Sequence, residues 1–246
     1  MLILLPPSET KRDGGEGPPL DLAALSFPTL TAARTQTLAA VRAMSRNLAA
    51  AAGMLKLGPA SAAEAARNRV LATSPTMPAL DRYDGVLFDE LDAASLPPDA
   101  RRFAGEHLAI GSALFGVTGA LDLIPAYRLS HDSRLPGSAS LGRIWKAPLT
   151  AALAAQEGLV LDLRSEGYAA LGPAPAGSRY VRVVSADGEG RKRALNHFNK
   201  KGKGAFTRRL LVAGIDHPDP DALLAWASAE GVRLEPGAAG ELDLVV

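Results

Sequence analysis

The amino-acid sequence predicts an α/β fold in which helices and strands interleave within a single domain, residues 1–246. Short apolar runs typical of buried strands alternate along the chain with longer segments of helical periodicity. A chain of 246 residues, 47% of them hydrophobic, can bury one large core. No Gly/Ser-rich linker or internal repeat divides it.

The N-terminal part predicts one strand followed by helices. Residues 2–5 are an apolar run that Pro6 and Pro7 end, as expected of a buried strand. Residues 11–19 have the composition of a loop. Residues 29–52 are rich in alanine and carry apolar side chains near helical spacing, which predicts one or two helices.

The middle of the chain predicts a capped helix and further strands. Ser61 and Glu64 have the spacing of a capping box, so a helix is expected to begin there. Residues 86–88 are a strand candidate, and residues 108–114 are apolar without a clear periodicity. Residues 159–163 are expected to form a buried strand.

The C-terminal part predicts a strand, a helix and a closing strand. Residues 180–184 alternate between apolar and polar side chains, as in a half-buried strand. Asp219 and Pro220 open a helix that runs to Ala229. Apolar side chains then alternate along residues 242–246, which predicts the last strand.

Positive charge is concentrated in one segment. Residues 191–215 contain eight Lys or Arg and no Asp or Glu, a net charge of +8 in a chain whose net charge is +1. Gly202 and Gly204 alternate with Lys201 and Lys203, so the Lys-Gly-Lys-Gly run is interpreted as a flexible cationic loop that can approach a phosphate. The alternative is a solvated charged edge without a ligand.

Composition and motifs exclude several classes of function. The chain has no cysteine and no apolar run long enough to span a membrane. Its first residues lack the features of a signal peptide, so we expect a cytoplasmic protein. The four histidines have no metal-ligand spacing, and we predict no metal and no cofactor. We predict no obligate protein partner and no membrane association.

Nucleophile and nucleotide motifs are also missing. Residues 111–118 have the glycine spacing of a P-loop, but Val117 stands where the motif requires lysine. No Gly-x-Ser-x-Gly elbow is present. The sequence therefore predicts no catalytic residue, and a non-enzymatic function is favoured.

Residues 57–65 can be compared with the turn of a helix-hairpin-helix. In that motif, main-chain N–H groups at a helix N-terminus bind a DNA phosphate. Gly58 suits this role, and Lys56 adds a cation where the motif usually has its first glycine. A capped turn between two helices without a ligand is the alternative interpretation.

Asp122 and Arg128 flank Pro125 in a loop. We expect them to form an ion pair that holds this loop, and the alternative is a contact between Arg128 and an anion or nucleic acid.

Several segments together resemble the YaaA family of bacterial peroxide-stress proteins. The resemblance covers nearly the whole chain and depends on the order of these segments: MLILLPPSETK, YDGVLFDELDA, IGSALFGVTGALDLIPAYRL, RIWKAPLT, LVLDLRSEGYAAL and HFNKKGKGAFTRRL. It implies an α/β fold peculiar to the family, a basic cleft that binds DNA, a helix-hairpin-helix and a role in the oxidative stress response.

The family's motifs match this sequence at two places. Its basic pattern falls on Lys200, Lys201, Lys203, Gly204 and Arg208, and its Leu-Asp-Leu and Tyr-Arg-Leu patterns fall on residues 121–123 and 127–129. The chain departs from the family at Thr118, Gly119 and Ala120, where members often have Leu-Arg-Pro and thus one more cation.

The sequence therefore predicts a protein that binds DNA without sequence preference. The expected contacts are Lys200, Lys201, Lys203, Gly204, Arg208, Arg209, Arg128, Lys56 and Gly58. One alternative is an enzyme acting on nucleic acid or a nucleotide, with Asp122, Arg128, Ser165, Glu166 and Tyr168 around a cleft. Another is a module that binds an acidic protein partner through the basic segment.

Overall fold

The computed structural model describes residues 1–186, 192–194 and 198–246. Within these residues an eight-stranded sheet has the order β4-β3-β1-β6-β7-β10-β9, and β8 pairs with β7. The strands are β1 (Leu2–Leu5), β3 (Leu108–Ser112), β4 (Gly116–Gly119), β6 (Val160–Asp162), β7 (Arg179–Ala186), β8 (Lys192–Ala194), β9 (Leu234–Pro236) and β10 (Glu241–Val245). The central strands β3, β1, β6, β7 and β10 are parallel, whereas β4, β8 and β9 pair antiparallel.

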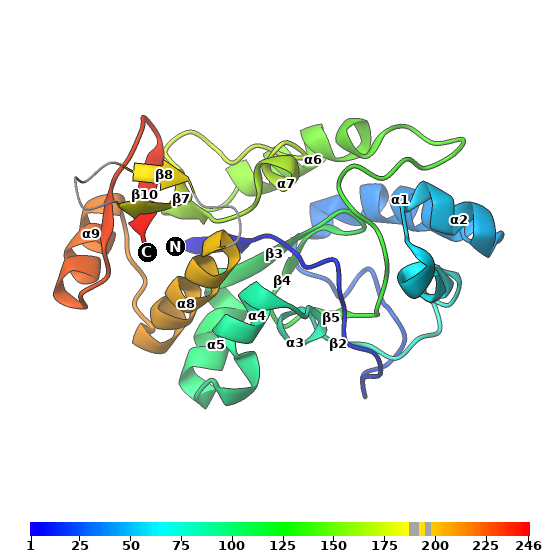
Figure 1. Cartoon of the computed structure of the whole chain (residues 1–246), viewed down its shortest axis with the longest axis horizontal. Coiled ribbons are helices and arrows are strands. Elements are labelled where there is room, and N and C mark those ends of the chain that lie inside the picture. The colour runs from blue at the N-terminus through cyan, green and yellow to red at the C-terminus, as the bar shows by residue number, and fades with distance from the viewer. Residues whose placement is uncertain (187–191, 195–197) are drawn as a thin grey trace.

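Helices cover both sides of this sheet. Figure 1 shows α4, α5 and α8 together below the sheet and α6 and α7 above it. The helices are α1 (Thr31–Met44), α2 (Leu48–Met54), α3 (Ala79–Arg82), α4 (Val86–Leu91), α5 (Pro98–His107), α6 (Leu141–Ala154), α7 (Glu166–Ala169), α8 (Phe198–Ala213) and α9 (Pro220–Ala229). Three 3-10 helices, η1 (Pro28–Leu30), η2 (Pro59–Arg69) and η3 (Ala93–Ser95), and a small sheet of β2 (Met77–Pro78) and β5 (Leu123–Ile124) complete the fold. The predicted α/β class is confirmed.

The strand order reverses next to β1. From β1 the chain continues to β3 on one side, and later reaches β6 on the other side. In such open sheets the loops after the two central strands separate to opposite faces, which leaves a crevice at their carboxyl ends. The fold therefore places a ligand-sized opening after Leu5 of β1 and Asp162 of β6.

Most predicted elements are confirmed. All four residues of β1 are buried because parallel strands flank it and helices cover the sheet. Residues 159–163, 180–184 and 242–246 contain β6, much of β7 and most of β10. Residues 29–52 form α1 and the start of α2. The side chain of Asp219 accepts a hydrogen bond from the N–H of Ala222, as expected of an N-cap.

The strand predicted at residues 86–88 is wrong, because these residues begin α4. Gly85 has a φ of 111°, which turns the chain into the helix. Leu87, Phe88 and Leu91 are then buried on one face of the helix. This helical spacing cannot be recognised from residues 86–88 alone.

The prediction that the Lys-Gly-Lys-Gly run forms a flexible loop is also wrong, because residues 198–213 form α8. The buried side chains of α8 recur at helical spacing: Lys203, Phe206, Thr207, Leu210 and Leu211. This pattern outweighs the low helix propensity of Gly202 and Gly204. Gly204 lies at the crossing with α4, where a Cβ atom would be only 2.9 Å from the Cβ atom of Glu90.

The capping box at Ser61 is not formed. The segment is the 3-10 helix η2, whose N-cap is Gly58 and whose first residue is Pro59. The Ser61 hydroxyl donates to the Gly58 carbonyl at 3.3 Å, and Glu64 binds Arg128. Neither side chain caps the helix, because each has a partner elsewhere.

Residues 108–119 form the hairpin of β3 and β4 rather than a phosphate-binding loop. Gly116, with a φ of 76°, makes its turn, and the ring of Trp145 packs against it. The indole Nε1 of Trp145 donates to the Ala113 carbonyl at 2.9 Å. The buried guanidinium of Arg34 donates to the carbonyls of Phe115 and Val117 and so fixes the same turn.

Candidate functional site

A cavity of about 540 Å³ opens at the carboxyl ends of β1 and β6. Five segments of the chain line it: the loop after β1, the start of α4, the loop between β5 and α6, the start of α7 and the first turns of α8. They are Pro6, Pro7, Ser8, Glu9, Thr10, Gly85, Val86, Leu87, Phe88, Ser130, His131, Ser165, Tyr168, Asn199, Lys200 and Lys203. This is the position at which open α/β sheets bind ligands.

Lys203 gives the cavity a buried cation. Its side chain is 4% exposed, and Nζ donates to the carbonyl oxygens of Leu163 at 2.8 Å and Arg164 at 3.4 Å. Burial lowers the pKa of Lys203 to about 8, and Asp162 acts in the opposite direction. The amine therefore remains mostly protonated at pH 7. An ammonium group has three N–H donors, so one is left for a ligand in the cavity.

Five polar side chains of the cavity have no partner among the residues that the structure describes. The hydroxyls of Ser8, Thr10 and Ser165 and the side chains of Asn199 and Lys200 make no hydrogen bond or ion pair within the described part of the chain. Ser165 is the N-cap residue of α7, yet its hydroxyl does not cap that helix. Polar groups that converge on one space without protein partners are free to bind a ligand.

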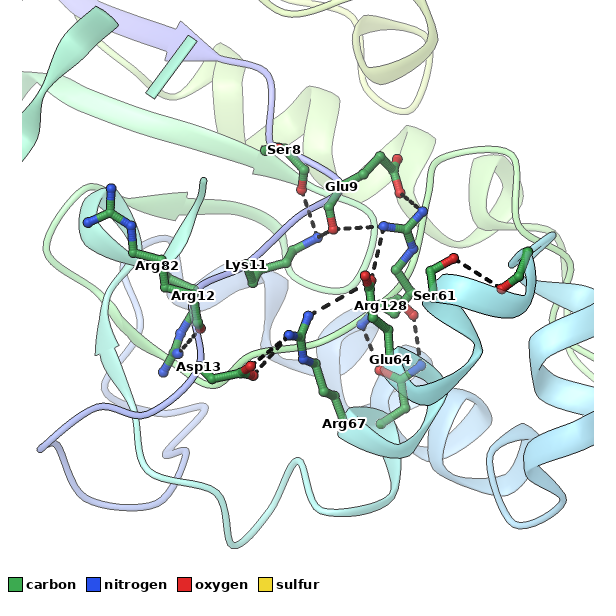
Figure 2. A network of polar contacts seen from close by, with 12 residues as sticks. Ser8, Glu9, Lys11, Arg12, Asp13, Ser61, Glu64, Arg67, Arg82 and Arg128 are labelled. Carbon is green, nitrogen blue, oxygen red and sulfur yellow. Dashed lines mark hydrogen bonds and ion pairs between the residues drawn. The ribbon is translucent and has the colours of Figure 1, made fainter. Parts of the chain in front are cut away.

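A buried lysine, Lys11, holds the loop after β1. Its side chain is 2% exposed, and Nζ donates to the carbonyl oxygens of Ser8 at 2.7 Å and Glu9 at 3.0 Å. The amine lies 4.2 Å from the centre of the Tyr127 ring. Burial lowers the pKa of Lys11 to about 7. Figure 2 shows this lysine and Arg128 pointing toward the same loop.

Arg128 links that loop to η2. Its Nη1 atom donates to the Glu9 carbonyl at 3.0 Å and to Glu64 Oε2 at 3.2 Å, and Nη2 lies 3.1 Å from Glu9 Oε2 (Figure 2). Asn68 fixes the main chain of Arg128 by accepting from its N–H and donating to its carbonyl. The predicted pair of Arg128 with Asp122 is therefore wrong, because two glutamates distant in sequence occupy the guanidinium.

Asp122 instead connects the segment at Ser26 with the end of β4 at Gly119. Its carboxylate accepts from the Ser26 N–H at 3.0 Å, the Ser26 hydroxyl at 2.7 Å and the Gly119 N–H at 2.9 Å. Asp122 does not line the cavity. Of the alternative catalytic set, Ser165 and Tyr168 line the cavity, whereas Glu166 is exposed and lies 3.4 Å from Arg182. The structure does not bring this set together around one cleft.

The cations of α8 have different environments. Lys201 Nζ lies 3.2 Å from Glu90 Oε1, and Arg208 donates to the carbonyls of Leu91 and Asp92. Arg209 donates to the Glu230 carbonyl. The basic segment therefore has acidic and carbonyl partners from other segments. Lys200 is exposed and has none within the described residues, while Arg191 and His197 lie outside those residues.

Lys56 and Gly58 lie in the turn between α2 and η2. Lys56 has a φ of 55°, and its amine is 2.6 Å from Asp132 Oδ2 at the surface. Gly58 is the N-cap of η2, and nothing lies within 4 Å of the position that a Cβ atom would occupy. Two helical segments joined by a short turn resemble a hairpin, but the second one is a 3-10 helix.

Sequence reasoning missed an arginine cluster formed by Arg42, Arg46 and Arg69. These side chains come from α1, the turn after it and the end of η2, and with Ala39 and Ala43 they line a surface depression of about 380 Å³. No hydrogen bond or ion pair of these three arginine side chains is found among the described residues. The spacing of Arg42 and Arg46 is a helical signal, but only the fold brings Arg69 beside them.

Neither a metal cluster nor a membrane-spanning helix is found in the part of the chain that the structure describes. No three His, Cys, Asp or Glu side chains gather there in a way that could hold a metal ion. No helix there has the length and apolar character needed to cross a bilayer.

Comparison with known proteins gives the family. Residues 1–236 match the family model described as peroxide stress protein YaaA. A UPF0246 protein of Corynebacterium glutamicum is 43% identical over 252 residues, covering 100% of both chains. One of Streptomyces coelicolor is 40% identical, covering 96% of this chain and 92% of the relative. One of Bacteroides thetaiotaomicron is 28% identical over 70% of each chain. The chain thus belongs to the YaaA family of peroxide stress proteins.

Proposed function

We propose that this member of the peroxide-stress family binds DNA through its backbone phosphates and without sequence preference. The observation that carries the proposal is the arginine cluster. Three guanidinium groups share one depression, and no carboxylate among the described residues lines it. Arginine binds phosphate with two parallel hydrogen bonds, and neutralising phosphates releases counterions from DNA.

Lys200 and the turn at Gly58 are further contacts in this proposal. Lys200 is exposed and unpaired within the described residues, and Gly58 leaves open space at the N-terminus of η2. Lys201 and Lys56 can contribute after giving up exposed ion pairs, which are worth little.

In this proposal the other residues predicted as DNA contacts have a structural role: they fix α8 or the loop after β1. Lys203 and Gly204 are buried, Arg208 and Arg209 donate to main-chain carbonyls, and Arg128 is paired with two glutamates. A duplex could reach these groups only if the packing around them opened. The proposed DNA surface therefore depends on the arginine cluster more than on α8.

The test is fluorescence anisotropy with two labelled duplexes of unrelated sequence at about 50 to 200 mM salt. Replacing Arg42, Arg46 and Arg69 together by Ala should weaken binding to both duplexes alike. The slope of log K against log [salt] should become flatter by about 2 to 3.

A matched control removes the same charge elsewhere. Arg12, Arg102 and Arg233 are exposed arginines that each lie beside a carboxylate. Replacing these three together by Ala should leave the salt slope nearly unchanged. An unchanged slope in the cluster variant, or an equal loss in both triple variants, would remove the cluster from the DNA site.

A further inference from the structure

We propose that the cavity at the carboxyl ends of β1 and β6 binds a nucleoside monophosphate, with its phosphate at Lys200 and Lys203. This inference goes beyond the proposed function, because a free nucleotide would satisfy it without any DNA. The same chemical unit could also come from a nucleotide that leaves the stack of a bound strand.

The charge of the cavity fits a phosphate. Lys200 and Lys203 both line it, and Glu9 is the one carboxylate among its lining residues within the described chain. That carboxylate lies 3.1 Å from Arg128 Nη2, so its charge is already compensated. The lining is therefore net positive, which favours an anion.

Hydrogen-bond donors converge on the same space. The hydroxyls of Ser8, Thr10 and Ser165 have no partner within the described residues, and neither has the side chain of Asn199. Asn199 and Lys200 lie in the first turn of α8, a helix of 16 residues, where the helix dipole adds to the attraction for an anion. These groups can share the phosphate oxygens and the sugar hydroxyls.

One wall of the cavity is apolar and suits a base. Pro6, Pro7, Val86, Leu87 and Phe88 line it. Phe88 is held in place by stacking on Tyr83, with 5.3 Å between ring centres. A volume of about 540 Å³ exceeds what a phosphate ion alone would fill, and it lies in the range of pockets for small organic ligands.

Isothermal titration calorimetry of the full chain with AMP and with adenosine tests this site at pH 7. AMP should bind at least tenfold more tightly than adenosine, because charge-assisted hydrogen bonds to the phosphate are lost in the nucleoside. Lys200→Ala and Ser165→Ala should each weaken AMP binding by about three- to tenfold. Neither side chain has a protein partner among the described residues, so neither change should disturb the fold.

Lys146→Ala is the matched control, because Lys146 is exposed on α6, makes no ion pair with the described residues and does not line the cavity. It should leave AMP affinity unchanged. The proposal is overturned if AMP gives no binding heat up to about 5 mM. A dissociation constant of about 5 mM corresponds to only ~3 kcal/mol of binding free energy. Equal AMP affinity of the wild type, Lys200→Ala and Ser165→Ala would also overturn it.

A second arm identifies the source of the nucleotide. A single strand containing 2-aminopurine becomes more fluorescent when that base leaves its stack, and AMP should reverse the change if both occupy the cavity. AMP binding without this competition would assign the site to free nucleotides. A failure of the anisotropy experiment on duplex DNA would leave the AMP titration unaffected, so the two proposals can fail separately.

Discussion

Replacing Gly204 by Ala tests whether this glycine serves helix packing or phosphate binding. In an open helix interior, Ala in place of Gly stabilises a protein by about 1 kcal/mol. At Gly204 the new Cβ atom would lie 2.9 Å from Glu90 Cβ and 3.1 Å from the Leu87 carbonyl carbon, and closer still to the Leu87 oxygen. Carbon atoms pack at about 3.5 to 4.0 Å, so α4 must retreat by roughly 1 Å.

This retreat should reduce stability more than the helix propensity gains. The nearest atoms belong to the main chain of α4, which cannot rotate away as a side-chain tip can. Overpacking of this kind costs about 1 to 3 kcal/mol. Subtracting the helix-propensity gain leaves an expected net loss of about 1 kcal/mol, which lowers the melting temperature by about 2 to 4 °C.

Two other glycines serve as controls. At Gly202 a Cβ atom would meet methyl groups of Val246 and Val183 at 3.0 and 3.2 Å, which can shift, so Gly202→Ala should change stability by less than about 1 kcal/mol. Gly53 lies in α2 with nothing within 4 Å, so Gly53→Ala should stabilise by about 0.5 to 1 kcal/mol.

Differential scanning calorimetry and urea unfolding of the three variants give the answer. A Gly204→Ala protein as stable as the wild type would refute the packing argument. If that variant were folded and stable but had lost DNA affinity, the glycine would instead serve close approach to a phosphate.

Two further predictions concern the half-buried Asp122 and the buried Lys11. Asp122→Ala should lower the free energy of unfolding by about 1 to 3 kcal/mol, because the N–H groups of Ser26 and Gly119 lose their acceptor, while DNA affinity should not change; a stable variant without DNA binding would contradict this structural role. Lys11 has its pKa lowered from 10.5 to about 7 by burial, so between these values the unfolded chain holds a proton that the folded chain has released. Wild-type stability should therefore rise with pH from about 7 to about 10, with Lys203 adding to the rise above about 8. Urea unfolding of Lys11→Met should show a shallower rise, and an identical pH profile would show that Lys11 stays protonated in the fold.

The sequence by itself determined the elements whose signals are local. The proline pair after β1, the Asp219 cap with Pro220, and the alternation along β7 and β10 each specify structure through neighbouring residues. The order of short motifs also identified the family, because that order spans nearly the whole chain.

Only the tertiary structure decided which charges are available to a ligand. The segment around Lys201 and Arg208 has no acidic residue of its own, yet Glu90 and the carbonyls after α4 reach it across the α4–α8 crossing. Arg42 and Arg69, in contrast, line one depression to which no carboxylate of the described residues contributes. Ion pairs and desolvation act over a few ångströms in space, whatever the distance along the chain. Charge patterning along the sequence therefore indicated a phosphate-binding protein, while the fold determined which cations remain free.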